Sequence, residues 1–150
     1  MANSYISLYV HCVFSTKNRL PLIRPEFQDR LWAYMGGIAR NVKMKALAVG
    51  GIQDHAHILL SLPGTLSVSK AVQTIKGNSS KWIHETFAYA QDFVWQEGFG
   101  AFSVNISIVE ATKKYIESQP EHHRRVSFQE EYISFLKKHN IDYDERYVWG

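Results

Sequence analysis

The chain has 150 residues, of which 45% are hydrophobic and 13% aromatic, and a formal net charge of +3. This composition predicts one globular domain with a substantial core and excludes a disordered chain. No apolar run approaches the roughly 20 residues of a transmembrane helix, and the single cysteine, Cys12, excludes an internal disulfide. With no recognisable export signal, we expect a cytoplasmic protein.

The first half of the chain alternates between strand and helix patterns. Apolar and polar residues alternate over residues 5–14, which is typical of a half-buried strand. The predicted elements that follow are a basic loop over residues 15–19, a helix opened by Pro25, a strand over 44–52 and a strand that begins at His55.

The second half predicts a helix, a strand and further helices. These are a helix over residues 68–87, a strand over 99–106, a helix over 108–118 that Pro120 stops, a helical tail over 126–139 and a loose or docked end over 143–150. The whole order indicates an α+β, ferredoxin-like (βαββαβ) antiparallel sheet with two helices on one face and additional C-terminal helices. We expect one domain over residues 1–150, with a core over about 4–119 and a helical tail over about 120–150.

The most informative segment is His55-Ala56-His57 on the predicted third strand. Strand side chains alternate between faces, so both histidines point the same way while Ala56 points toward the helices. We therefore expect His55 and His57 on the opposite, open face of the sheet, together with His11. Two adjacent imidazoles could bind one divalent metal ion, although the pair could equally be ordinary surface histidines.

A second pair of residues could complete such a site. Tyr115 and Gln119 are four residues apart on a predicted helix and so share one face. A tyrosine can supply a nucleophilic phenol, and a glutamine can supply a carbonyl oxygen to a metal ion. Each residue taken singly is also an ordinary helix residue. His122 and His123 suggest a second metal site, but they follow Pro120 in a charged segment, and we interpret them as an exposed turn.

Five segments together resemble the single-tyrosine HUH transposases of the insertion sequence 200 type. The resemblance covers nearly the whole chain and lies in residues 11–19 with Pro21, Asp54–His57, Ile75–Ser80, Trp95–Phe99 and Tyr115–Gln119. One histidine-x-histidine motif alone is a weak indication, whereas all five segments in this order are a strong one.

This resemblance implies a function and a set of roles. Such transposases cleave and rejoin single-stranded DNA at insertion-sequence ends that form hairpins, through a 5′-phosphotyrosine link, with Mg²⁺ or Mn²⁺. It implies Tyr115 as the nucleophile and His55, His57 and Gln119 as metal ligands. It also implies a homodimer in which active sites are shared between subunits. The alternatives are a non-catalytic binder of single-stranded nucleic acid and a rolling-circle replication initiator nuclease.

Several cations could neutralise DNA phosphates. Such contacts give affinity that depends on salt and carries little sequence information. The alternative is an ordinary solvated surface. The candidates, which include one hydroxyl side chain, are Lys17, Arg19, Lys76, Ser80 and Lys114.

Overall fold

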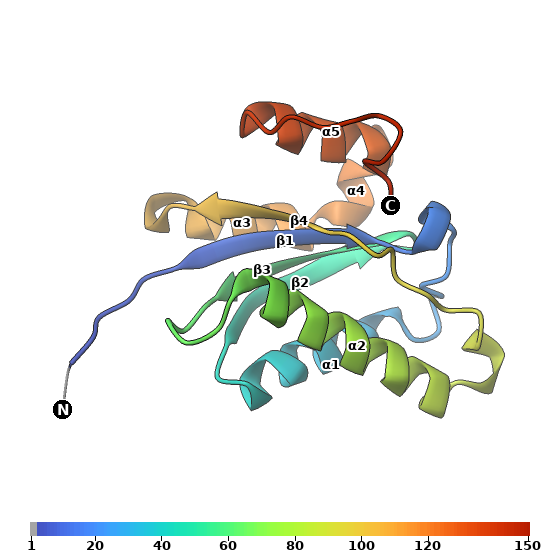
Figure 1. The fold of residues 1–150 in the computed structure, drawn as a ribbon. Helices are drawn as coiled ribbons and strands as arrows, with labels where there is room; N and C mark the ends of the chain where they lie inside the picture. Colours follow the sequence, from blue (N-terminus) through green and yellow to red (C-terminus); the bar gives the residue numbers. More distant parts are fainter. Residues whose placement is uncertain (1–2) are drawn as a thin grey trace.

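The computed structural model describes residues 3–150 and shows a four-stranded sheet between two helical layers (Figure 1). The strands are β1 (Tyr9–Ser15), β2 (Lys45–Ile52), β3 (His55–Ser61) and β4 (Gly100–Val104). Their order is β2-β3-β1-β4, and every neighbouring pair is antiparallel. The predicted ferredoxin-like α+β fold is confirmed.

The helices divide between the two faces of this sheet. One layer consists of α1 (Gln28–Asn41) and α2 (Val68–Thr86). The other layer contains α3 (Val109–Glu117), α4 (Gln119–His122) and α5 (Phe128–Lys138) (Figure 1). Short 3-10 turns, η1 (Lys17–Arg19), η2 (Ala88–Ala90) and η3 (Ile106–Ile108), lie in the connections.

Most predicted boundaries lie within two residues of the observed ones, and three of the differences are informative. The first strand begins at Tyr9, because residues 5–8 alternate in hydropathy but lack a pairing strand. The first helix begins at Gln28, and Pro25 lies in the turn before it. The last strand ends at Val104, because the Asn105 side chain accepts a hydrogen bond from the Ser107 amide and starts η3. The two strand differences arise from a missing partner and a cap, which the periodicity does not specify.

The apolar face of the sheet packs on α1 and α2 as the alternation predicts. Side chains from β1 and β3 meet both helices in one cluster, which includes Phe14, Ile58, Leu60, Leu31, Met35 and Ile75, all 0–1% exposed. Complete burial of such a side chain stabilises the fold by about 1.5–3 kcal/mol. This face is the main core.

The C-terminal tail, residues 143–150, packs against the rest of the domain. Trp149 packs on Tyr132, with ring centroids 5.9 Å apart, and joins the cluster around Phe128 on the α5 side. The carbonyl oxygen of Gly150 accepts hydrogen bonds from Gly98 N at 3.0 Å and Gln96 Nε2 at 2.9 Å. These contacts hold the tail against the loop that precedes β4.

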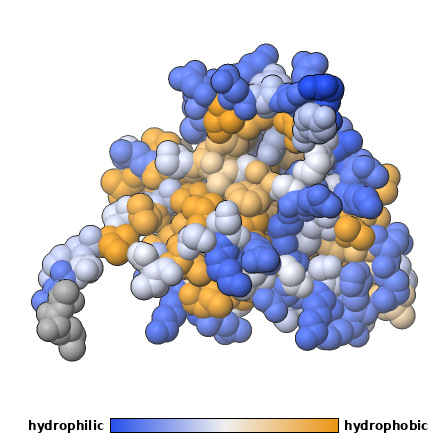
Figure 2. Space-filling view, in the orientation of Figure 1, coloured by the Kyte–Doolittle hydropathy of each residue, from blue (hydrophilic) through white to orange (hydrophobic). Residues whose placement is uncertain are grey.

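Among residues 3–150, no helix is both long enough and apolar enough to span a membrane. On the face in Figure 2, hydrophilic residues cover α5, and apolar residues gather beneath it over the edge of the sheet.

Candidate active site

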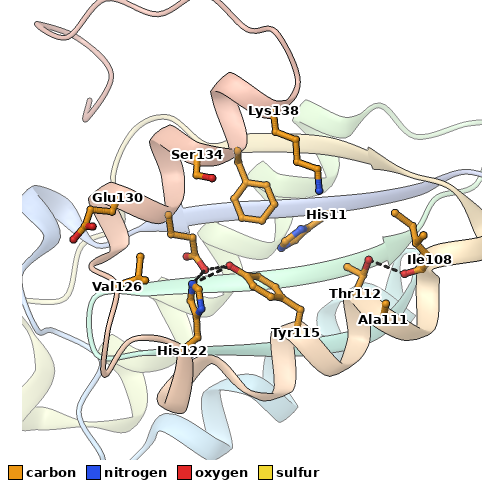
Figure 3. Close-up of a pocket in the computed structure, with 12 residues that line it drawn as sticks. His11, Ile108, Ala111, Thr112, Tyr115, His122, Val126, Glu130, Ser134 and Lys138 are labelled. Carbon is orange, nitrogen blue, oxygen red and sulfur yellow. Dashed lines mark hydrogen bonds and ion pairs between the residues drawn. The ribbon is translucent and has the colours of Figure 1, made fainter.

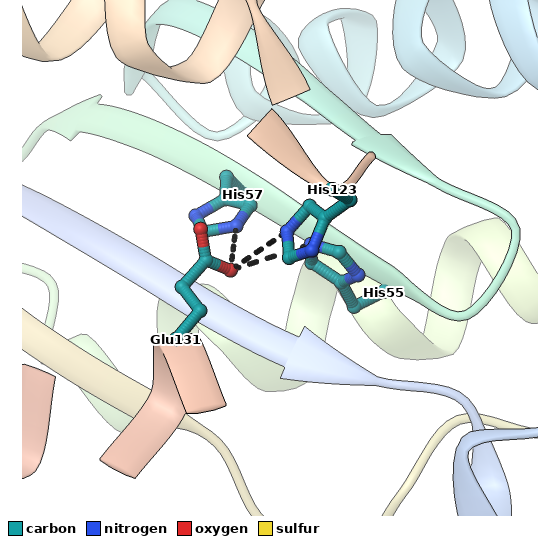
Figure 4. Close-up of side chains that lie close together, drawn as sticks. All are labelled: His55, His57, His123 and Glu131. Atoms are coloured by element: carbon teal, nitrogen blue, oxygen red, sulfur yellow. Dashed lines mark hydrogen bonds and ion pairs between the residues drawn. The ribbon is translucent and has the colours of Figure 1, made fainter. Parts of the chain in front are cut away.

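The two histidines of β3 are buried, not exposed. His55 and His57 are both 0% exposed, because α4 and α5 return over their face of the sheet (Figures 1 and 4). The expectation of an open face was therefore wrong. Strand alternation separates two faces, but it does not reveal which later segment covers each of them.

The Nδ1 atom of each β3 histidine lies within hydrogen-bond distance of a neighbouring side chain. His55 Nδ1 lies 2.7 Å from Asp54 Oδ1, and His57 Nδ1 lies 2.7 Å from His11 Nε2. His11 shares this face, as predicted. Both Nε2 atoms then point inward, 3.5 Å (His55) and 2.9 Å (His57) from one carboxylate oxygen of Glu131. The Nε2 atoms of the two imidazoles therefore face the same carboxylate oxygen.

Glu131 is the centre of the buried network. It lies on α5, is 3% exposed, and was not among the site residues predicted from the sequence. One oxygen lies 3.2 Å from His123 Nε2, and the other accepts hydrogen bonds from Gln119 Nε2 at 3.1 Å and from the Tyr115 phenol. Burial opposes the carboxylate charge, but hydrogen bonds from His123, His57 and Tyr115 hold the pKa of Glu131 well below its usual range.

His123 also belongs to this network, so its interpretation as an exposed turn residue was wrong. Its side chain is 2% exposed, and its Nδ1 donates to the carbonyl oxygen of Val126 at 2.6 Å. Its Nε2 lies 2.7 Å from Gln119 Oε1. Pro120 lies at the start of α4, and this short helix turns His123 inward. Burial works against the charged ring, but the Glu131 hydrogen bond raises the pKa of His123.

Tyr115 lies beside the histidines of its own chain. Its ring centroid is 5.9 Å from that of His57, and its oxygen is 3.3 Å from His122 Nε2. Burial and the Glu131 carboxylate raise the pKa of Tyr115 well above its usual range, so the phenol keeps its proton. The phenol faces a cleft of about 580 Å³ between α3 and α5, which His11 and Phe135 also line (Figure 3).

The donor atoms suit a divalent cation. One potential ligand atom each from His55, His57, His123 and Glu131 lies within 4.8 Å of the others (Figure 4). Gln119 Oε1 lies 2.9 Å from His55 Nε2, so the structure brings all three sequence-predicted metal ligands together. Imidazole nitrogens with carboxylate and amide oxygens form a donor set suited to Mn²⁺, and the oxygens also suit Mg²⁺.

One sequence pattern could have identified Glu131. It follows Phe128 by three residues and precedes Tyr132, so it lies on the apolar stripe of a helix whose N-terminus has a capping box. A carboxylate on such a stripe is buried with the stripe and needs partners there. No comparable local pattern marks His123, because its orientation depends on the turn between α4 and α5.

Two glycines position both halves of the site. Gly51 has a φ of +153°, and a Cβ there would lie 2.1 Å from the His55 carbonyl oxygen. A Cβ on Gly50 would lie 2.5 Å from the carbonyl oxygen of Ile116, the residue after Tyr115. Only glycine therefore allows the tight turn before His55 and the close approach of α3 to β2.

The residues predicted to bind DNA lie on several elements, and both Lys17 and Lys76 lie beside the loop over residues 94–97. Lys114 is exposed on α3 next to Tyr115, and Lys17 is exposed in η1. The Arg19 guanidinium lies over the Trp149 ring, 5.2 Å from its centroid. Lys76 and Ser80 line a groove of about 380 Å³ on α2. Their roles in DNA binding stay predictions.

The Lys76 ammonium is already hydrogen-bonded to backbone carbonyls. It donates to the carbonyl oxygens of Gly98 at 2.9 Å and Gln96 at 2.5 Å, and burial lowers its pKa to about 8. These contacts anchor the loop before β4. Lys76 is therefore less available to a phosphate than Lys114.

Comparisons with solved structures agree with this fold. A solved structure of a candidate transposase from Deinococcus radiodurans superposes with a TM-score of 0.63 at 22% identity, covering 79% of this chain and 96% of that one. A REP-associated tyrosine transposase, solved bound to a REP hairpin, gives 0.60 at 21% identity, covering 84% of this chain and 74% of that one. These likenesses show the fold. No curated protein matches the sequence.

The family comparison is more specific. The family model for IS200-like transposases matches residues 4–119, which include β1 to α3 and both histidines of β3 together with Tyr115 and Gln119. The match covers well over half of the chain, and the chain belongs to the IS200-like transposase family.

Proposed function

We propose that this protein cleaves and rejoins single-stranded DNA with Tyr115 as its nucleophile. The observation that carries the proposal is the position of the Tyr115 phenol, which lies beside His57 and shares Glu131 with it. A nucleophilic side chain next to a candidate metal centre, at the wall of a cleft, is the arrangement that phosphoryl transfer requires.

The covalent step exchanges one ester bond for another. The Tyr115 oxygen attacks phosphorus, the bond from phosphorus to the 3′ oxygen breaks, and the 5′ end stays linked to the tyrosine. The phenol proton leaves along its hydrogen bond to the Glu131 carboxylate and ends on the leaving 3′ oxygen, which becomes a hydroxyl, so that Glu131 is again a carboxylate after the step. A 3′-hydroxyl reverses the step on rejoining, so no ATP is needed.

The metal ligands in this proposal are His55, His57 and Gln119, and His123 and Glu131 offer further donor atoms. When bound, Mg²⁺ or Mn²⁺ would act as a Lewis acid that withdraws charge from a phosphate oxygen. Asp54 and His11 orient the two β3 rings, and α4 and α5 exclude water from their inner side.

The proposed substrate is a DNA strand with a hairpin end, supported by the REP hairpin in the related complex. A cytoplasmic homodimer also belongs to the proposal. Since Tyr115 already lies beside the histidines of its own chain, a dimer does not require an exchange of the tyrosine helices between subunits.

An adduct assay tests the function. The purified protein is mixed with a labelled single-stranded DNA that carries a hairpin end and with Mn²⁺. We expect a complex that resists denaturant, and we expect Tyr115→Phe to reduce its yield by about 1,000-fold or more, as expected when a nucleophile is removed.

The matched control is Tyr132→Phe, since Tyr132 is a buried tyrosine of α5 that packs on Phe128. This variant should form the adduct as the wild type does. An adduct from Tyr115→Phe would show that the nucleophile is assigned wrongly. DNA binding with no adduct from the wild-type chain would favour a non-catalytic binding protein.

A further inference from the structure

The bond between His11 and His57 is a histidine–histidine hydrogen bond inside the candidate site. His11 Nε2 and His57 Nδ1 are 2.7 Å apart, and both rings are at most 3% exposed. His11 stands opposite Leu59 in the β1–β3 register, and Val13 stands opposite His57, so the two histidines are diagonal neighbours on one face. Only one of the two facing nitrogens can supply the shared hydrogen.

The far side of His57 indicates which nitrogen that is. His57 Nε2 lies 2.9 Å from Glu131 Oε1, and a carboxylate oxygen only accepts. His57 therefore carries its hydrogen on Nε2 and accepts from His11 at Nδ1. Burial supports this arrangement, since His57 is fully buried and a low-dielectric environment favours an uncharged ring with one hydrogen.

A metal ligand needs the reverse arrangement. A cation bound to His57 Nε2 takes the lone pair there, so the hydrogen of the ring must be on Nδ1. His11 would then have to accept through Nε2 and carry its own hydrogen on Nδ1. A histidine can serve in both roles, whereas a lysine could only donate and a carboxylate could only accept.

We propose that His11 is a positioning residue that donates to His57 Nδ1 when His57 faces Glu131 and accepts from it when His57 Nε2 binds a cation. The second role rests on the proposed metal-assisted function. Each ring keeps one hydrogen throughout: the shared hydrogen moves from His11 to His57, His57 Nε2 releases one proton, and His11 Nδ1 gains one. His11 lines the cleft beside Tyr115, where it can exchange a proton with solvent.

Nuclear magnetic resonance of the metal-free protein with ¹⁵N-labelled histidine tests the first role. We expect a scalar coupling between His11 Nε2 and His57 Nδ1, with the hydrogen bound to His11. Absence of the coupling, or a hydrogen on His57 Nδ1 without metal, would overturn the proposal. With saturating Mg²⁺, the shared hydrogen should move to His57, and an unchanged position in a protein that binds Mg²⁺ would contradict the second role.

Two variants test the effect on metal binding. His11→Phe keeps an aromatic ring beside Phe135 but removes both hydrogen-bonding roles, and it should weaken Mn²⁺ binding about tenfold or more in calorimetry. His11→Gln has an amide that can donate or accept, and it should recover most of the affinity. His139→Phe is the control, because His139 packs on Phe102 without contacting His57. Wild-type Mn²⁺ affinity in His11→Phe would overturn the positioning role.

The two hypotheses fail in different ways. If the wild-type protein bound no Mn²⁺, the proposed metal assistance would fail, and the coupling measured in the metal-free protein would still decide whether His11 donates to His57.

Discussion

The two faces of the sheet are built from the same strands but are stabilised differently. The face toward α1 and α2 buries apolar side chains such as Phe14, Ile58 and Leu60. The face toward α4 and α5 buries two β3 histidines and a glutamate whose polar atoms all have partners: among the described residues, no buried side-chain nitrogen or oxygen lacks a hydrogen bond. One face tolerates any well-packed apolar set, whereas the other depends on matched donors and acceptors.

This difference separates stability from chemistry. Apolar packing contributes most of the free energy of folding. A buried polar network is costly to desolvate and is strongly destabilised when one member is lost. We therefore expect substitutions on the first face to change the free energy of unfolding alone, and substitutions on the second face to change metal binding and pH dependence as well.

Phe27→Ala should give the largest effect on stability. Phe27 is 0% exposed and stacks on Phe87 with ring centroids 4.9 Å apart. Truncation removes its burial and leaves a cavity, which should lower the free energy of unfolding by about 3–5 kcal/mol in urea titrations. The adduct yield per folded molecule should stay at the wild-type level. A large loss of that yield would show that the two faces are coupled.

Acid should destabilise the histidine face next. Burial lowers the pKa of His11 to about 3 and that of His57 to about 4, whereas both rings would titrate near 6.5 in the unfolded chain. Between pH 6.5 and 4, these two rings become protonated in the unfolded chain but stay uncharged in the folded protein. The stability contribution is thus complete above pH 6.5 and lost as the pH falls, by an amount on the order of 3 kcal/mol for each of the two rings.

Urea unfolding at a series of pH values measures this loss. His11→Phe should show a shallower decline than the wild type, because one of the two buried rings is gone. A wild-type stability that is constant from pH 7 to 4 would contradict the buried, uncharged state of these rings.

Glu131→Gln should weaken metal binding with less effect on the fold. The amide can still accept from His57, but the negative charge near the three histidines is lost, so we expect Mn²⁺ affinity to fall about tenfold to a hundredfold in calorimetry. Glu130→Gln is the matched control, since Glu130 is the exposed neighbour that caps α5. Equal affinities for both variants would remove Glu131 from the metal site.

Lys114→Ala should give the smallest effect. Lys114 is exposed beside Tyr115, so its loss should weaken DNA binding uniformly across sequences and reduce the slope of log affinity against log salt by about 1. Lys76→Met, measured in the same titration, should leave that slope nearly unchanged, because the Lys76 ammonium is bound to backbone carbonyls. A larger slope change for Lys76→Met would reverse our ranking of the two lysines.

The sequence predicted the fold and half of the site. Alternation on β1 and β3 was sufficient to place His11, His55 and His57 on one face, because strand geometry is local. The predicted shared helix face of Tyr115 and Gln119 was wrong, because α3 ends at Glu117 and Gln119 begins α4, so the two side chains reach one site from two helices. The remaining half, Glu131 and His123, depends on where the tail packs, and tail packing is set by tertiary contacts that periodicity does not encode.

The glycine pair before the β3 histidines has a consequence for how this family can vary. Gly50 and Gly51 have no functional group, yet a single added methyl would collide with the backbone of α3 at one position and with the His55 carbonyl at the other. In a saturation screen for DNA cleavage, both positions should therefore tolerate as few substitutions as Tyr115. Intolerance to substitution in such a screen would identify the residues that bring catalytic groups together as readily as those that react.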